Sequence, residues 1–414
     1  MNGSMGLLLG LLLVSYLGSS RSGRWSPRFG SPSATEYVML GLLLGPFALG
    51  LIDRSGISEF EPILVAGASW LALVAGVGYG GSATRHGLRF AVLGALLTLI
   101  VALGVGAAVL ATLDLLAPAD TAPGWVLAAA VATVGSATTH QGVRWTVARS
   151  RARGPLAASV IDATRASPVA PALVLATICA AAPGHGLIQT TLLVRVSATV
   201  GIGAALGAVA ALLLGREFRR DESWGILLGS ALLGAGVAAR LGLSAVAAMF
   251  TFGIVLSASS PHRAAIRTLV APTDRAVLLP VALLAGASLK LAAIPNYWVL
   301  LLAALGSRLF MDSFRGWVFP WLFPTGEQRT RLGLGLMSTG GFTLAAALEL
   351  DSRLGDPMGP FLLLLAAAGN LVGELLAPSA LRAALERAGE LAQPASDAPA
   401  SSVGVRSSDP GVSA

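Results

Sequence analysis

The sequence predicts an all-α polytopic membrane protein of about 13 transmembrane helices, arranged as inverted-topology repeats with two discontinuous helices. The first observation is composition: 55% of the 414 residues are hydrophobic and 12% are charged, too apolar for a water-soluble globule. The second is that apolar residues form runs of roughly 15 to 27, the length that crosses the hydrocarbon core as a helix. The third is a short polar run in the middle of two of these segments.

The apolar runs, taken in order along the chain, predict the membrane segments to within a few residues. They cover residues 5–19, 36–52, 62–80, 88–113, 124–140, 156–182, 188–214, 224–239, 241–258, 276–293, 297–314, 331–350 and 358–381. The first is short and is followed by small residues, as in the apolar core of a signal peptide. No Lys or Arg precedes it, and we therefore expect a retained helix.

The basic residues predict the orientation of these segments. Arginines gather in alternate connections, which lie in the cytoplasm if the N-terminus is outside and the C-terminus inside. The predicted inner connections are 21–28, 85–89, 144–153, 216–220, 263–275, 315–331 and 382–406. The net charge of +7 is therefore spread over many loops. This spread predicts contact with anionic lipid headgroups and argues against a nucleic-acid partner.

Composition also divides the chain into parts. The predicted parts are an N-terminal helix and cytoplasmic loop at 1–35, a membrane domain at 36–385 and a cytoplasmic tail at 386–414. The end of the tail is rich in Ser, Ala, Pro and Asp without an apolar period, and we expect it to be disordered. The membrane domain is predicted to hold repeats at about 36–182 and 224–385, joined by a linker helix at 188–214.

Two pairs of segments indicate the repeat. Residues 71–77 are similar to 279–287, and the interrupted segment 124–140 is similar in type to 331–350. In the predicted topology the first interrupted segment runs inward and the second outward, so the repeats have opposite orientation. Inverted repeats with helices broken near the midplane are typical of secondary transporters.

The two interruptions are the first candidate site. They read Ser-Ala-Thr-Thr-His at 136–140 and Ser-Thr-Gly-Gly at 338–341. Backbone groups that lose their helical partners inside a membrane need a cavity, a side chain or an ion. Small polar runs also occur simply because they let helices pack closely. Two runs in symmetric places favour a transport site, with candidate residues Thr138, Thr139, His140, Ser338 and Thr339.

Three ionisable residues lie deep in predicted segments. Asp162 and Arg165 are about 10–15 Å into theirs and Arg308 about 16 Å into its own, at 1.5 Å per residue. Charges at such depth are costly and usually mark a pathway. Asp162 can release a proton and capture a cation as competing events at one carboxylate, with Arg308 as counter-charge.

Ion pairing offers a structural alternative for the same residues. Arg165 is at i+3 from Asp162 and could hold it permanently, and Asp312 is at i+4 from Arg308. His140 likewise has two readings, a proton relay or a polar residue that closes a helix end.

The remaining chemistry-bearing residues exclude several functions. Cys179 is the only cysteine, so no intrachain disulfide and no cysteine metal cluster can form. The deep residues contain no paired acids, no metal-ligand spacing and no nucleophile–base spacing. The sequence therefore predicts no cofactor, no metal and no enzymatic activity.

Several motifs over residues 36–385 resemble the monovalent cation:proton antiporters, especially bacterial sodium/proton exchangers and potassium-efflux membrane domains. Residues 41–46 look like an early G-x-L-L-G-P segment, 137–140 like an A-T-S-P break and 160–163 like a V-I-D-D ion site. Ser307-Arg308 lies where Gly-Lys or Arg is usual, and Ala377-Pro378 matches a closing L-A-P. The resemblance implies a sodium/proton antiporter-like fold in a bacterial inner membrane. It also implies a homodimer whose core bundle carries sodium or potassium and protons past a scaffold by an elevator-like movement.

The sequence departs from this family at the chemistry itself. Ala163 replaces the second acid of the ion site, and a shift of one residue would instead match Asp162 to the acid of an N-D site. His140 replaces the proline of the break, Gly341 stands where relatives carry Glu, and Arg165 adds a charge where relatives are apolar. Arg165 and Ala163 are therefore candidate modulators of the site.

Three functions are consistent with these residues. The first is cation:proton antiport by alternating access with Asp162 as the exchanging carboxylate. The second is a carrier of an organic or anionic solute on the same scaffold, because two arginines and two half-helix N-termini favour negative charge. The third is a non-transporting relative with a sensing or partner-binding role. We rank antiport first because the family likeness is extensive.

Overall fold

The computed structural model describes residues 34–52, 57, 59–79, 85–116, 124–182, 191–215, 220–290, 294–322 and 329–391. The predicted segment at 5–19 and most of the predicted tail lie outside this range. The described residues are organised as α-helices. In chain order they are α2 (Thr35–Leu44), α4 (Glu61–Tyr79), α5 (Arg85–Leu116), α6 (Gly124–Ser136), α7 (His140–Arg149), α8 (Pro155–Arg165), α9 (Val169–Ala181), α10 (Leu192–Leu213), α11 (Arg220–Arg240), α12 (Ala245–Ser259), α13 (Arg263–Ser288), α14 (Ile294–Leu322), α15 (Arg329–Gly335), α16 (Gly341–Leu354) and α17 (Met358–Arg387).

These helices confirm the polytopic membrane architecture. Within the described residues, eight helical spans are long and apolar enough to cross a membrane, and α2 and α12 are shorter apolar helices. Both predicted interruptions are present, one between α6 and α7 and the other between α15 and α16. The two discontinuous helices follow from short runs of Ser, Thr and Gly, which do not stabilise a continuous helix.

Several segments differ from the sequence expectation. The segment predicted at 36–52 ends as a helix at Leu44, because Gly45 and Pro46 follow. The segment predicted at 156–182 is divided into α8 and α9 by a turn that ends at Pro168. Helix α13 begins at Arg263, well before the predicted start at residue 276, so its first turns hold charged residues that were assigned to a loop.

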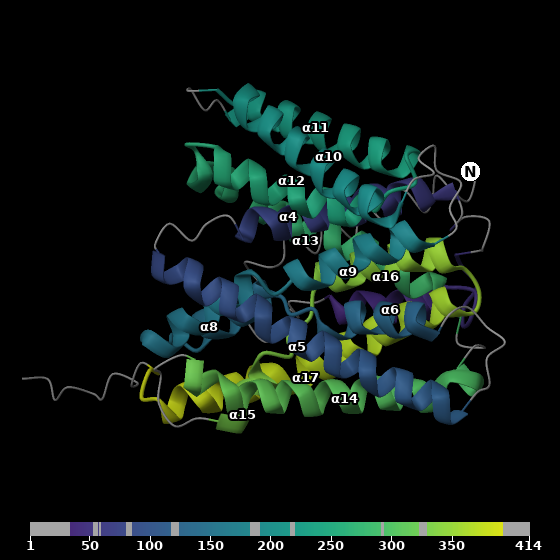
Figure 1. Ribbon diagram of the computed structural model, residues 1–414, viewed down its shortest axis with the longest axis vertical. Coiled ribbons are helices and arrows are strands. Elements are labelled where there is room, and N and C mark those ends of the chain that lie inside the picture. Colours follow the sequence, from purple (N-terminus) through teal and green to yellow (C-terminus); the bar gives the residue numbers. More distant parts are fainter. Residues whose placement is uncertain are drawn as a thin grey trace, which may run out of the picture.

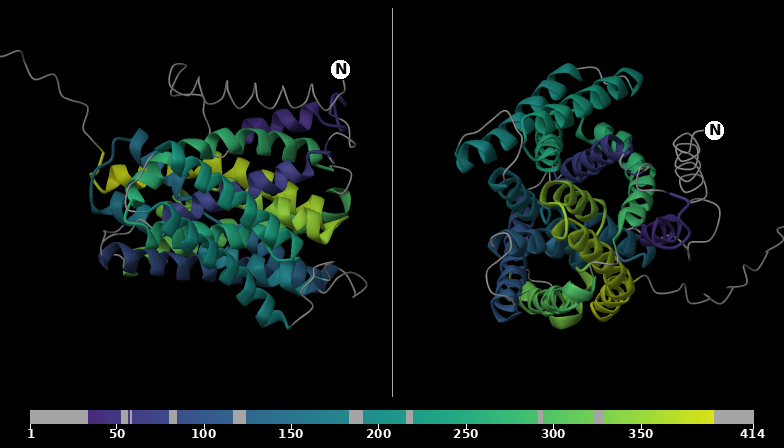
Figure 2. Two further views of the ribbon diagram at one scale, coloured as in Figure 1. Left: turned by 90° about the horizontal axis from the view of Figure 1, so that it is seen from above. Right: turned by 90° about the vertical axis from the view of Figure 1, so that its right-hand side faces the viewer.

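The helices form two bodies that lie side by side (Figure 1). One, here the core body, contains α5 to α9 and α14 to α17. The other, the scaffold body, contains α2, α4 and α10 to α13. Figure 2 shows the same bundle from above and from the end. Helix α16 of the core packs extensively against α4 of the scaffold, so the second broken helix lies at the boundary between the bodies.

The packing repeats from one half of the chain to the other. In the first half, α2, α4, α5 and α6 follow one another; in the second half, α12, α13, α14 and α15 take the corresponding places. Helix α2 packs on α13, and its counterpart α12 packs on α4. Likewise α5 packs on α6, and their counterparts α14 and α15 pack on each other. The helix contacts thus repeat from one half to the other, as the predicted inverted repeats require.

Two glycines lie at the contact between α2 and α13. A Cβ atom on Gly41 of α2 would collide with the backbone carbonyl of Leu283 in α13. A Cβ atom on Gly286 of α13 would collide with the carbonyl of Val38 in α2. Each glycine therefore lies against the carbonyl three residues before its partner glycine, and the two backbones touch.

The α4–α12 pair contains the same contact. A Cβ atom on Gly76 would collide with the carbonyl of Phe250, and one on Gly253 with the carbonyl of Leu73. The offset of three residues is again identical. Gly76 and Gly286 occupy the sequence-similar segments 71–77 and 279–287, so the likeness seen in the sequence marks a shared packing contact. Small residues that let backbones approach are a common basis of helix association in membranes.

Candidate ion-translocation site

The two helix interruptions meet each other inside the core body. The backbone N–H of Thr139 donates a 2.8 Å hydrogen bond to the carbonyl of Ser338, which joins the first interruption to the second. Gly142 and Gly340 make the close approach possible, because a Cβ atom on either would strike the side chain of Ser338 or Thr139, respectively. The crossing therefore brings together Thr138, Thr139, His140, Ser338 and Thr339, the five residues predicted from the interruptions.

Two buried arginines from α14 cap the carbonyl ends of the half-helices. The guanidinium of Arg308 donates to the carbonyl of Met337 at 3.1 Å and to that of Ala137 at 3.4 Å. The guanidinium of Arg315 donates to the carbonyl of Leu336 at 2.9 Å. These carbonyls follow α15 and α6, so the arginines replace helical hydrogen bonds that the interruptions remove.

One carboxylate joins the two arginines. Asp312 lies 2.7 Å from Arg315 and 3.6 Å from Arg308, and the three side chains are 2–4% exposed. Their summed charge is +1. Two half-helix C-termini contribute about −0.5 each, so the charges at this end of the crossing sum to about zero. The cluster therefore stabilises the crossing electrostatically.

Arg315 corrects the sequence analysis, which assigned it to a cytoplasmic loop. Helix α14 continues to Leu322 instead of ending near residue 314, and this buries Arg315 in the core body. Its Nη1 also donates to the hydroxyl of Thr138 at 3.2 Å. The predicted segment ended too early because Asp312, Ser313 and Arg315 lower the local hydropathy. Asp312 and Arg315 form an ion pair, so the helix can bury both charges.

A small cavity lies at the N-terminal ends of the other two half-helices, α7 and α16. We call it the crossing cavity, and its volume is about 20 Å³. Its lining residues come from both interruptions and from three further helices: Leu71, Ala75, Ala137, Thr138, Thr139, His140, Gln141, Arg165, Pro168, Asp274, Gly340, Gly341, Phe342 and Thr343. A space of about 10–15 Å³ holds one water, so the cavity is large enough for one water molecule or one dehydrated monovalent cation.

Asp162 lies next to this cavity through its ion pair with Arg165. The carboxylate and the guanidinium are 3.1 Å apart, and their side chains are 25% and 22% exposed. Arg165 lines the crossing cavity, whereas Asp162 does not. The structure therefore contains the i,i+3 pair that the spacing allowed, at the end of α8. Ala163, the neighbour of Asp162, is buried and packs against Gly94 of α5.

The turn after α8 is tied to the first interruption. The hydroxyl of Ser167 accepts a 3.1 Å hydrogen bond from the backbone N–H of Thr138 and lies 3.1 Å from the hydroxyl of Thr98. This contact fixes the position of Arg165 relative to the crossing. The side chain of His140, at the start of α7, faces Gly78 of α4, so it lies at the boundary with the scaffold body.

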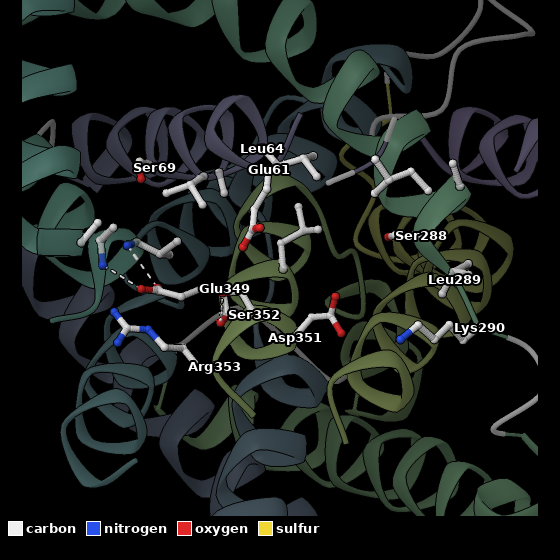
Figure 3. A pocket seen from close by; sticks show the side chains of 18 of the residues that line it. Glu61, Leu64, Ser69, Ser288, Leu289, Lys290, Glu349, Asp351, Ser352 and Arg353 are labelled. Carbon is white, nitrogen blue, oxygen red and sulfur yellow. Dashed lines mark hydrogen bonds between the residues drawn. The ribbon is translucent and has the colours of Figure 1, made fainter. Parts of the chain in front are cut away.

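A second, larger cavity of about 810 Å³ opens at the end of the molecule where α4 begins and α13 and α16 end. Glu61 of α4 and Asp351 of α16 project into this large cavity (Figure 3). The carboxylate of Glu349 instead accepts hydrogen bonds from Ala245 N–H at 2.7 Å and Val246 N–H at 3.1 Å. Glu349 thus joins α16 of the core to the first turn of α12 in the scaffold.

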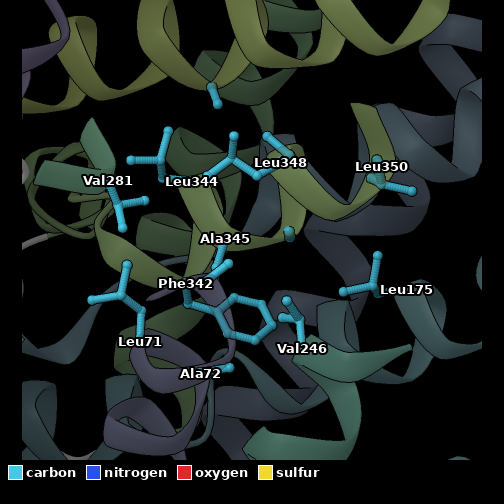
Figure 4. Packing of buried hydrophobic residues seen from close by; sticks show 14 of the residues in the cluster. Leu71, Ala72, Leu175, Val246, Val281, Phe342, Leu344, Ala345, Leu348 and Leu350 are labelled. Carbon is cyan, nitrogen blue, oxygen red and sulfur yellow. The ribbon is translucent and has the colours of Figure 1, made fainter. Parts of the chain in front are cut away.

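Buried apolar side chains of one cluster line parts of both cavities, and Figure 4 shows the packing of this cluster. Val246 and Leu348 line the large cavity, and Leu71 and Phe342 line the crossing cavity. All four belong to one buried cluster, in which Phe342 also lies 5.4 Å from the ring of Phe250. These side chains are close-packed, as in a protein interior.

Sequence reasoning missed Asp274 and Glu349. Asp274 lies in α13, and both its neighbour Arg275 and the preceding Pro272 made this stretch resemble a loop. Glu349 lies near the end of the segment predicted at 331–350 and was passed over. An acid inside a membrane segment indicates a functional site. Had the predicted segment begun at residue 263, Asp274 would have been recognised as such an acid. No group of His, Cys, Asp or Glu in the described part of the chain could hold a metal ion.

A family model decides the identity. The model for the transmembrane region of sodium/hydrogen exchangers matches residues 10–376. The chain belongs to the sodium/hydrogen exchanger family. The members of this family are membrane transporters that exchange monovalent cations for protons, and they are not enzymes. Curated protein sequences give no significant match to the chain.

Two solved structures of an antiporter have the same fold as this chain. The sodium proton antiporter MjNhaP1 from Methanocaldococcus jannaschii at pH 8 is 17% identical, with 94% of this chain and 99% of that chain covered and a TM-score of 0.65. An electron-microscopy structure of MjNhaP1 is 16% identical over the same shares, with a TM-score of 0.68. The antiporter-like fold expected from the motifs is thereby confirmed.

Proposed function

We propose that this exchanger moves a monovalent cation against protons by alternating access, with Asp162 as the exchanging carboxylate. The observation that carries the proposal is the pairing of Asp162 with Arg165 beside the crossing cavity. Asp162 is half-buried at the end of α8, so its carboxylate can exchange a proton or a cation with water. A cation that binds there competes with the proton for one group, which couples the two fluxes.

Arg165 sets the occupancy of Asp162 in this proposal. The pair is 22–25% exposed, so its two side chains are less enclosed than those of the Arg308–Asp312–Arg315 cluster. A cation can therefore displace the guanidinium at lower cost than in that cluster. Arg308 acts as the counter-charge at the far end of the crossing, where it holds the half-helix carbonyls in place.

Alternating access is supported by the two cavities, whose walls share one buried apolar cluster. We propose that the core body moves relative to the scaffold body, so that the crossing cavity opens to one side of the membrane at a time. Glycine contacts hold α2 to α13 and α4 to α12 and keep the scaffold rigid during this movement. The hydrogen bonds of Glu349 to α12 would break and reform.

The setting of the protein completes the proposal. Sodium or potassium is the expected cation, and the protein works as a homodimer in the bacterial inner membrane with its N-terminus outside. Support comes from the family membership and from the arginines on alternate connections. Anionic lipid headgroups contact the arginine-rich side.

Proton flux in proteoliposomes tests the proposal. Sodium, potassium and lithium are added in turn across pH 6 to 9, and internal pH is read with a dye. Cation-dependent proton flux in the wild type is expected, with loss of that flux in Asp162→Asn. Correctly folded protein that gives no flux with any cation would contradict antiport and direct the search to anionic solutes.

A further inference from the structure

The charge balance at the crossing cavity needs a carboxylate that the core body does not supply. The N-termini of α7 and α16 face this cavity and contribute about +0.5 each. Arg165 adds a full positive charge, which Asp162 neutralises at 3.1 Å. Among the groups that line the cavity and the ion-pair partner of Arg165, the core therefore leaves about one positive charge, which would repel an entering cation.

Asp274 of the scaffold body supplies the missing negative charge. It comes from α13 and is the only acid among the described residues that line the crossing cavity. Its side chain is hydrogen bonded to Gln141 in the first turn of α7. Trp70 of α4 donates a 2.8 Å hydrogen bond to the hydroxyl of the preceding residue, Thr273, and so fixes this turn of α13.

We infer that Asp274 binds the transported cation in the crossing cavity, opposite the half-helix N-termini, and so replaces the second acid absent at Ala163. The inference rests on the proposed function. Oxygen ligands hold hard cations, and this cavity offers the carboxylate of Asp274 beside the amide of Gln141 and threonine side chains. A volume of about 20 Å³ fits one dehydrated monovalent cation in place of a water.

The position of Asp274 gives this ligand a distinct role from Asp162. Asp162 belongs to the core body and Asp274 to the scaffold, and Arg165, which pairs with Asp162, lines the cavity together with Asp274. A movement of the core would carry Asp162, Arg165 and the half-helix N-termini away from Asp274. Asp274 therefore helps to load the cation in this conformation and releases it when the core moves.

A purely structural role for Asp274 predicts something else. As a fixed counter-charge to the half-helix ends, it would affect stability and leave cation affinity unchanged. The two roles separate in two measurements on purified protein. One is the apparent KM for the cation in proton flux, and the other is the rise in melting temperature on addition of sodium, potassium or lithium chloride.

The test compares wild type, Asp274→Asn, Asp274→Glu and the control Asp114→Asn, whose carboxylate is exposed at the end of α5. For Asp274→Asn we expect an apparent KM raised at least about tenfold, equal to about 1.4 kcal/mol of binding, and loss of the cation-dependent rise in melting temperature. Asp274→Glu should keep part of both effects, and Asp114→Asn should match wild type. If Asp274→Asn does not fold, a KM changed at least threefold in Asp274→Glu supports the inference.

Several results would overturn it. If the apparent KM of Asp274→Asn stays within twofold of wild type, Asp274 is not a cation ligand, and the antiport proposal is unaffected. The same conclusion holds for Asp274→Glu if Asp274→Asn does not fold. If Asp114→Asn raises the apparent KM as much as Asp274→Asn does, the effect is a non-specific effect of charge and Asp274 is not a ligand. A wild type that shows neither flux nor cation-dependent stabilisation would refute the proposed function and this inference together.

Discussion

Arg315 lies 2.7 Å from Asp312 in the centre of the core body, and both side chains are almost fully buried. Asp312 lies on α14 between Arg308 and Arg315 and forms ion pairs with both guanidiniums. The arginines in turn bind the carbonyls that the two half-helices leave open. The integrity of the crossing thus depends on one carboxylate that has no direct part in the proposed transport chemistry.

Replacement of Asp312 by Asn should therefore destabilise the fold strongly. It leaves two guanidiniums buried with uncompensated charge, and the loss of one partner of a buried ion pair costs about 3–5 kcal/mol. The melting temperature of the detergent-purified variant measures this effect. Lys290→Met is the matched control, because Lys290 pairs with Asp356 at 2.6 Å where the side chains are 43% and 64% exposed. Equal melting temperatures for the two variants would refute the role of Asp312.

Replacement of Arg165 by Leu should leave the fold intact and change transport. The Asp162–Arg165 pair is partly exposed, so its loss should cost less than the about 3–5 kcal/mol expected for a fully buried pair such as Asp312–Arg315. The freed carboxylate binds cations without competition, and we expect a lower apparent KM in cation-dependent proton flux. Unfolding of Arg165→Leu, seen as loss of the monodisperse peak in size-exclusion chromatography, would identify the pair as structural.

Replacement of Gly76 or Gly286 by Ala should destabilise the scaffold to a similar degree. Each new methyl group collides with a carbonyl of the opposing helix, and such overpacking costs about 1–3 kcal/mol. Gly229→Ala on α11 is the control, because its Cβ meets nothing within 4 Å and alanine favours the helix by about 1 kcal/mol. Thermal unfolding of the three variants checks the expectation. If Gly76→Ala and Gly286→Ala matched Gly229→Ala, the close contacts would be disproved.

Replacement of Glu349 by Ala should loosen the contact between core and scaffold. Two buried N–H groups of α12 and the hydroxyl of Ser244 lose their acceptor, at a cost of about 1–3 kcal/mol for an unsatisfied group. We expect a lower melting temperature and faster hydrogen exchange in residues 244–247. Glu349→Gln keeps part of the hydrogen bonding, so its melting temperature and exchange rate should lie between those of Glu349→Ala and wild type. Unchanged exchange in the Ala variant would show that α12 does not depend on this carboxylate.

The sequence was sufficient to predict the architecture because the apolar runs and the two polar interruptions are local signals. The likeness of segments 71–77 and 279–287 indicated the repeat, and the structure places the contact glycines Gly76 and Gly286 in these segments. The buried charges were harder to predict. Arg315 and Asp274 lower the hydropathy of their windows, and only three-dimensional pairing with Asp312 and Gln141 shows that a helix can bury them.

The central claim is that the carboxylate of Asp162 carries the exchange, and one comparison tests it most directly. Asp162→Asn and the control Asp114→Asn are reconstituted at equal density beside wild type, and cation-driven proton flux is measured in the same liposomes. We expect flux in Asp114→Asn equal to wild type and no flux above empty liposomes in a correctly folded Asp162→Asn. Wild-type flux in Asp162→Asn would contradict the account and move the exchanging group elsewhere in the crossing.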